Sequence, residues 1–181
     1  MSLLSALPEA VIAQIRAVLP ELREARAIEG RFDAEELKRV SARAPAVLVA
    51  RIGLTQIPRN PDFQLLGYQM RLAAFVLTRS DLGQTAQAVQ AQIVDTLLRL
   101  IPDRAWGLAD AGPAAAVTEA PIVTRETRER QVLLTAVTWD QPVMLQPVAA
   151  GDVVNLQIWT GQAPQIGTGH EADYTLAGGT P

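Results

Sequence analysis

At 181 residues the chain has the length of one globular domain. It contains no cysteine, which excludes disulfides, thiol chemistry and cysteine-ligated zinc. Its formal net charge of −3 argues against a general nucleic-acid surface, because such a surface needs clustered lysines and arginines. No uncharged apolar run is long enough to span a membrane, and the N-terminus lacks the basic start of a secretory signal. We therefore expect a cytoplasmic protein without membrane contact.

The N-terminal part predicts two helices separated by a charged connector. Pro8–Leu19 has an apolar stripe, with its proline in the first turn, where the missing N–H costs nothing. Residues 22–29 carry charges of both signs and are expected to form a short exposed strand or connector, or else a salt-bridge seam between subunits. Asp33 followed by Glu36 is a capping box that opens a second, short helix, and Pro45 closes it.

Two strands are predicted in the central part of the chain. Ala46–Gly53 is apolar on both faces until Arg51, which is typical of a strand inside a sheet. A turn-rich loop, Gln56–Asp62, leads into Leu65–Leu77, where residues alternate with a period of two and indicate a long strand. Several apolar residues of this run can also share one helical face, so a helix remains the alternative.

A long amphipathic helix is predicted to follow the second strand. Ser80 or Asp81 is expected to cap it, and it ends at Ile101–Pro102 because a proline disfavours helical geometry in the preceding residue. Its apolar residues recur every three or four positions, which indicates a helix laid on a sheet. They are Leu82, Ala86, Val89, Ile93, Leu97 and Leu100.

The remaining third predicts two more strands and an irregular end. Ala114–Thr124 is interrupted by a proline and is therefore expected at a sheet edge. Thr127–Trp139 is a stronger strand that ends at Gln141–Pro142. Beyond it, small and polar residues dominate, with at most one short strand in Val153–Trp159, so this end is expected to be an extended arm or disordered. These boundaries predict an α+β domain at 1–140 and an extension at 141–181.

In this order of elements the chain resembles the Mu-like bacteriophage tail terminator, or tail completion, proteins of contractile-tailed phages and prophages. The resemblance covers residues 7–140. It is carried by Leu19–Arg23, Ala44–Val49, the Phe63–Thr78 strand with its Arg71, and the Ala86–Leu100 helix. The Gly/Pro-rich end after Gln141 departs from the common pattern of that family.

The resemblance implies an α+β subunit with a curved mixed or antiparallel sheet packed on one face by two to three helices, and an irregular C-terminal arm. It implies a structural virion protein, not an enzyme and without a cofactor, that closes a hexameric ring on the tail tube. The ring would stop tube polymerisation and form the joint to the neck and head. Implied partners are other copies of the chain, the tube protein and a neck or head-completion protein, with DNA passing transiently through the ring. The expected location is the virion tail, assembled in the cytoplasm of the bacterial host.

Charged residues on the connector, the loops and the strands are the expected contacts to neighbouring subunits or to the tube. They are Glu24, Arg26, Arg59, Asp62, Arg71, Arg125 and Arg128. The last two alternate with glutamates, which favours a charged strand end over a DNA-facing lumen.

No catalytic, metal or cofactor site is predicted. His170 is the only histidine and lies close in sequence to Glu171 and Asp173, a set that could bind a metal weakly or move a proton. A solvated tail is the favoured interpretation of this set, because the segment offers no rigid framework. The sequence has neither a phosphate loop nor a nucleophile elbow. The alternative function is a small-molecule-binding or hydrolytic α+β domain, with a pocket near Trp106 or near His170.

Overall fold

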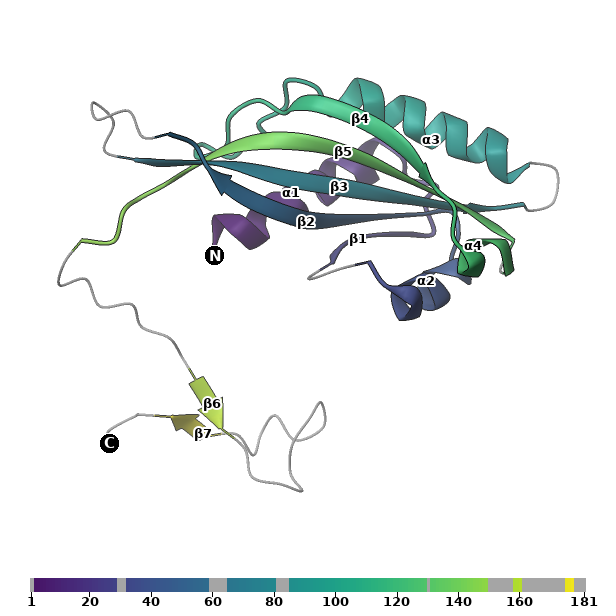
Figure 1. The fold of residues 1–181 in the computed structure, drawn as a ribbon, viewed down its shortest axis with the longest axis horizontal. Helices are drawn as coiled ribbons and strands as arrows, with labels where there is room; N and C mark the ends of the chain where they lie inside the picture. The colour runs from purple at the N-terminus through teal and green to yellow at the C-terminus, as the bar shows by residue number, and fades with distance from the viewer. Residues whose placement is uncertain are drawn as a thin grey trace. The chain divides into compact units, whose positions relative to one another are not determined.

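A computed structural model describes residues 2–28, 32–58, 65–80, 85–129, 131–149, 158–160 and 175–177. The chain forms two compact units, Met1–Pro147 and Val148–Pro181. The elements, labelled in Figure 1, are α1 (Leu3–Val18), β1 (Glu24–Ile28), α2 (Ala34–Ser41), β2 (Ala46–Gln56), β3 (Leu66–Arg79), α3 (Ala86–Leu100), β4 (Ala115–Ile122), α4 (Arg125–Glu129), β5 (Val132–Leu145), β6 (Ile158–Thr160) and β7 (Thr175–Ala177). None of the helices in the described ranges is both long and apolar enough to cross a lipid bilayer.

The first unit is built on a five-stranded sheet with the order β1-β2-β3-β5-β4. The β1 strand runs parallel to β2, and every other neighbouring pair is antiparallel. The expected α+β fold with a mixed sheet is therefore confirmed. The run for which a helix was the alternative forms β3, the central strand, which pairs along its length with β2 and β5.

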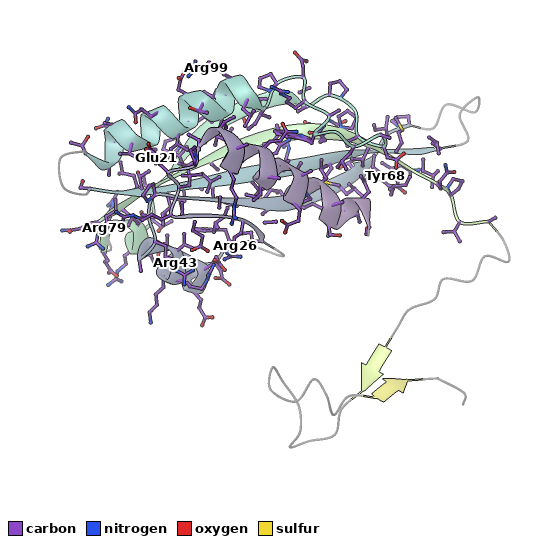
Figure 2. The ribbon with its side chains drawn as sticks, turned by 180° about the vertical axis from the view of Figure 1, so that it is seen from behind. Glu21, Arg26, Arg43, Tyr68, Arg79 and Arg99 are labelled. Atoms are coloured by element: carbon purple, nitrogen blue, oxygen red, sulfur yellow. The ribbon has the colours of Figure 1, made fainter. Side chains whose placement is uncertain are left out.

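Both faces of the central strands are apolar. Even-numbered residues of β3, such as Leu72 and Val76, belong to a core that α1 and α3 cover, and we call this side the α1/α3 face (Figure 2). Odd-numbered residues, such as Phe75 and Leu77, belong to a second core, on the side we call the α2 face, which includes buried residues of α2. Phe32 stacks on Phe75 there, with 4.7 Å between the ring centroids. Side chains of one strand alternate between faces, so a strand that is apolar at every position needs cover on both sides.

A buried glutamine joins the end of the sheet to the loop between α3 and β4. The side-chain oxygen of Gln141 accepts hydrogen bonds from the indole N–H groups of Trp106, at 2.8 Å, and Trp139, at 3.2 Å. Its amide nitrogen donates to the carbonyl of Arg104, at 2.9 Å, and to the carbonyl of Gly112. Every hydrogen-bonding position of the glutamine amide is thereby filled. Trp106 is consequently a core residue, and its indole N–H is occupied within the protein.

Two helices begin at positions other than those predicted. The α1 helix starts at Leu3, because the Ser2 side chain accepts from the amide of Leu4 as an N-cap, so Pro8 lies inside the helix and not in its first turn. The cap of α3 is Thr85, which accepts from the amide of Ala88 at 3.2 Å. The prediction of Ser80 as the cap is wrong, although its hydroxyl accepts from the amide of Ala86 at 3.3 Å. The predicted cap Asp81 and first helical residue Leu82 lie outside the described residues.

The predicted strand from Thr127 to Trp139 is displaced along the chain. Thr127 belongs to the short helix α4, and β5 continues through Pro142 to Leu145. The Pro142 carbonyl accepts from the amide of Gly112 at 2.8 Å. The nitrogen and carbonyl of one strand residue face the same side, so the missing N–H of this proline faces the loop and removes no hydrogen bond to β3.

The connector at 22–29 contains the edge strand β1, whose Glu24 and Ala25 are buried and not exposed as expected. The capping box is confirmed, since Asp33 accepts from the amide of Glu36 at 2.8 Å. The predicted edge strand around Pro121 is confirmed as β4. In the second unit, β6 and β7 form an antiparallel pair, and only the end of the predicted strand Val153–Trp159 is described.

Burial on the α1/α3 face predicts a sharp contrast between neighbouring leucines of α3. Leu97 is fully buried and Leu98 is 39% exposed. We expect Leu97→Ala to lower the free energy of unfolding by about 2–5 kcal/mol, because it leaves a cavity, and Leu98→Ala by no more than about 0.5 kcal/mol. Urea unfolding followed by circular dichroism measures both, and equal losses would contradict this packing.

Replacing the buried glutamine is expected to destabilise the loop between α3 and β4. Gln141→Leu removes the hydrogen-bond partner of two indole N–H groups and of the Gly112 carbonyl, whereas the Arg104 carbonyl keeps its bond from the amide of Ala114; we expect this to cost more than about 2 kcal/mol of unfolding free energy. Gln92→Leu on the exposed face of α3 is the matched control and should change it by less than about 0.5 kcal/mol. Tryptophan fluorescence during urea unfolding gives the comparison.

Candidate functional site

A cluster of charges joins β1 to α2. Glu24, only 7% exposed, accepts from Arg26 at 2.8 Å and from Arg39 at 3.0 Å, and lies 3.6 Å from Arg43. Glu36 accepts from Arg39 at 2.6 Å and also pairs with Arg26. Figure 2 shows Arg26 and Arg43 on this part of the molecule. Two carboxylates thus hold three guanidinium groups, so the predicted contact residues Glu24 and Arg26 pair first within their own chain.

Arginine side chains also close the outer edge of β1. The Arg16 guanidinium donates to the carbonyl of Ala25 at 2.8 Å, and Arg26 donates to the carbonyl of Ala27 at 3.4 Å. Carbonyls of alternate residues point to the same side of a strand, and these two point away from β2. An edge whose acceptors are occupied is a poor template for another strand.

The predicted contact residue Arg71 forms a two-bonded ion pair across the sheet. Its guanidinium donates to the two carboxylate oxygens of Asp140 at 2.8 and 3.1 Å. These hydrogen bonds, followed by the negative charge of Asp140, raise the pKa of Arg71 above its ordinary value. Both residues lie on the α2 face, at the half of the sheet that lies beyond the core covered by α2. On this half of the α2 face, Arg71 and Asp140 therefore form a polar pair whose charges balance each other.

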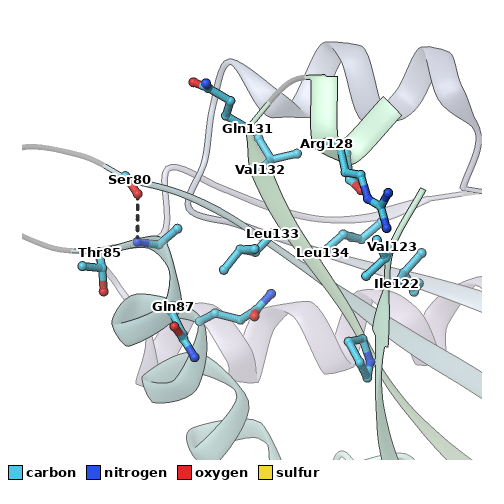
Figure 3. A pocket seen from close by; sticks show the side chains of 14 residues that line it. Ser80, Thr85, Gln87, Ile122, Val123, Arg128, Gln131, Val132, Leu133 and Leu134 are labelled. Atoms are coloured by element: carbon cyan, nitrogen blue, oxygen red, sulfur yellow. Dashed lines mark hydrogen bonds between the residues drawn. The ribbon is translucent and has the colours of Figure 1, made fainter. Parts of the chain in front are cut away.

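A cleft of about 490 Å³ opens between the start of α3, the end of β4 and the start of β5 (Figure 3). Its apolar wall includes Val123 and Leu133, which are 64% and 39% exposed. The predicted contact residue Arg128 lines the cleft from α4, whereas Arg125 pairs with Glu129 at 2.7 Å. The buried side-chain nitrogen of Gln90, which also lines the cleft, has no hydrogen-bond partner among the described residues.

A larger groove, of about 1290 Å³, lies at the opposite edge of the sheet. It is lined by Leu4 and Pro8 of α1, by Phe75, and by Ile52 and Leu54 of β2, which are 52% and 37% exposed. This surface was not predicted from the sequence. The signal available in the sequence was the apolar pair beyond Arg51, inside what was expected to be the end of a strand.

The structure brings Glu24 and Arg26 together and leaves Arg71 and the α4 arginines on separate surfaces. Arg59 and Asp62 lie outside the described residues, and so does the cluster of His170, Glu171 and Asp173. Within the described ranges, no three histidine or acidic side chains gather in a way that could hold a metal ion.

No protein-family model and no curated protein matches this chain. Among solved structures, the chain is similar to the sheath/tube terminator of an extracellular contractile injection system, PVC, determined in its extended state by cryo-EM. The identity is 14% and the TM-score 0.42, and the match covers 91% of this chain. The chain spans 66% of the length of that structure, just under two thirds. A likeness at this identity and TM-score assigns neither a family nor a function.

The charge cluster predicts that Glu24 stabilises the subunit. Glu24→Gln removes the buried negative charge that faces three arginines, and we expect the free energy of unfolding to fall by about 1–3 kcal/mol. Glu129→Gln, which breaks only an exposed pair within α4, should cost no more than about 0.5 kcal/mol. Urea unfolding measures both variants, and a neutral Glu24→Gln would show that the cluster contributes nothing to stability.

Proposed function

We propose that the protein is a non-enzymatic assembly subunit of a contractile tail, a terminator that closes as a ring on the tail tube and stops its growth. The observation that carries this proposal is the pair of different apolar surfaces on opposite edges of one sheet. One is the cleft with Val123 and Leu133, and the other is the groove with Ile52 and Leu54. A subunit that closes a ring by rotation needs two such unlike surfaces, because each copy contacts its neighbours through different sides.

The order of elements is consistent with the same proposal. The charged edge strand, the short capped helix, the two long strands and the amphipathic helix α3 follow one another as the resemblance to the Mu-like tail terminators requires. In the proposed assembly six copies form the ring, and the tube protein and a neck or head-completion protein bind its two ends. DNA passes transiently through the lumen. The protein is then part of the virion tail and is assembled in the host cytoplasm.

A second candidate function is the binding of a small molecule, and the buried amide of Gln90 favours it. A cleft of about 490 Å³ is within the usual size range of small-ligand sites. The buried nitrogen of Gln90 has no hydrogen-bond partner in the part of the chain that the structure describes, and a ligand with an oxygen acceptor would supply one. This function predicts saturable binding by a monomer, whereas the ring predicts association between copies.

The proposed ring predicts that the mass of the protein particles in solution rises with protein concentration. Light scattering of the full chain should show a rise from one subunit towards a closed hexamer, both alone and after addition of purified tail tubes from the same phage or prophage. The tubes should also carry the protein into the pellet on sedimentation and stop elongating when it is present. A protein that stays monomeric and neither binds the tubes nor arrests their growth would overturn the proposed function.

A further inference from the structure

Half of β2 is a strand edge that has no neighbouring strand among the described residues. β1 pairs with its first five residues, Ala46–Ala50, and the remaining six, Arg51–Gln56, pair only with β3 within the described residues. Every residue of this second half is exposed, including the apolar Ile52 and Leu54. One row of its backbone amides and carbonyls therefore faces the groove of about 1290 Å³. Unpaired backbone groups in a row beside a groove are a template for another strand.

At the opposite edge of the sheet lies β4, whose outer side no described strand covers. In β5, the amide of Met144 donates to the carbonyl of Asp110, and the carbonyl of Pro142 accepts from the amide of Gly112. The backbone N–H and C=O groups of even-numbered β5 residues therefore point away from β3. Thr138 and Ala136 are also even-numbered, so their backbone groups point toward β4, where they pair with Thr118 and Ala120. The intervening Glu119 and Pro121 therefore direct their backbone groups to the outside. The proline removes one donor at the far end of β4, and the part before it remains able to pair.

The two free edges carry opposite charges on the same face of the sheet. Arg51 is the only charged residue of Arg51–Gln56, and Glu119 is the only charged residue of β4. Arg51 lies opposite Leu72 and Glu119 opposite Val137, and both of these partners belong to the core on the α1/α3 face. Both charged side chains are exposed, and neither has an ion pair with a described residue.

From these observations we infer that neighbouring copies of this chain join by strand pairing, the outer edge of β4 in one copy lying along Arg51–Gln56 in the next. This contact deepens the proposed ring and rests on it, because it names the surfaces through which ring neighbours bind. β4 runs opposite to β2 within one sheet, so copies related by rotation pair these strands in the antiparallel sense. The incoming β4 lies end to end with the resident β1 along a single long β2.

The contact uses two unlike edges and is therefore heterologous, as a ring requires. The alternative edge, β1, is closed to another strand by Arg16 and Arg26, which occupy its outward carbonyls. Side chains of the incoming strand enter the groove beside Ile52 and Leu54 and cover these two exposed residues. Arg51 and Glu119 then meet across the new strand pair, where opposite charges stabilise the contact.

Cross-linking between introduced cysteines tests this contact, since the chain has none of its own. The variant carries Thr55→Cys on β2 and Thr118→Cys on β4, two exposed positions that share the α2 face. Within one copy, β2 and β4 are three strand spacings apart, which is roughly 14 Å. A bismaleimide with a span shorter than this distance can therefore link the two cysteines only between copies. The matched control carries Leu98→Cys on the exposed side of α3 together with Thr118→Cys. Each variant is examined alone and with tail tubes.

For the variant with Thr55→Cys and Thr118→Cys, which we call the edge pair, we expect a ladder of cross-linked products that extends beyond dimers. For the control variant we expect only background cross-linking. Arg51→Glu or Glu119→Arg alone should lower the yield roughly threefold, and the two together should restore it, because like charges across a strand pair repel and exchanged charges attract. Equal ladders in the edge pair and the control, dimers from Thr118→Cys alone, or absence of a ladder would overturn the inference. Light scattering of the same samples separates the two proposals: a hexamer without a ladder leaves the ring standing, whereas monomers that ignore the tubes overturn both.

Discussion

Burial of β3 on both faces is the constraint on which the rest of this subunit depends. From Leu72 to Thr78 every side chain of the strand is buried, and such a strand is stable only where apolar surface covers it from both sides. The α1 and α3 helices supply that cover on one face and α2 on the other. The charge cluster of β1 and α2 fits into the same arrangement. Glu24 holds α2 against the sheet through Arg39, and this keeps the second core closed.

Much of the fold could be predicted because the sheet has a strong pattern. The two-residue period of β3, the apolar start of β2 and the proline in β4 each predicted a strand that the structure confirms, although a helix remained the alternative for β3. The boundaries that failed depend on contacts outside the local pattern. Thr85 caps α3 although Ser80 lies nearer the strand, and β5 passes through Pro142 because a loop, and not a strand, faces its nitrogen.

The candidate site was less accessible from the sequence than the fold. Its charged residues could be named, since alternating signs at Glu24 and Arg26 are visible in the chain. Their true partners could not, because Glu36 and Arg39 meet them only after α2 has packed on the sheet. The open half of β2 was hidden for a similar reason. It exists because an eleven-residue strand is paired with a five-residue one, a mismatch that only the strand register reveals.

The irregularity between Arg51 and Gly53 gives this mismatch a geometric meaning. The register of β2 against β3 shifts there by one residue, and a bulge of this kind bends its strand and increases the local twist. The outer half of β2 is thereby turned relative to the half that carries β1. If a neighbouring subunit follows the direction of that outer half, the one extra residue in β2 determines the angle between adjacent subunits. The curvature of the whole assembly would then depend less on the side chains at the contact than on where the bulge falls.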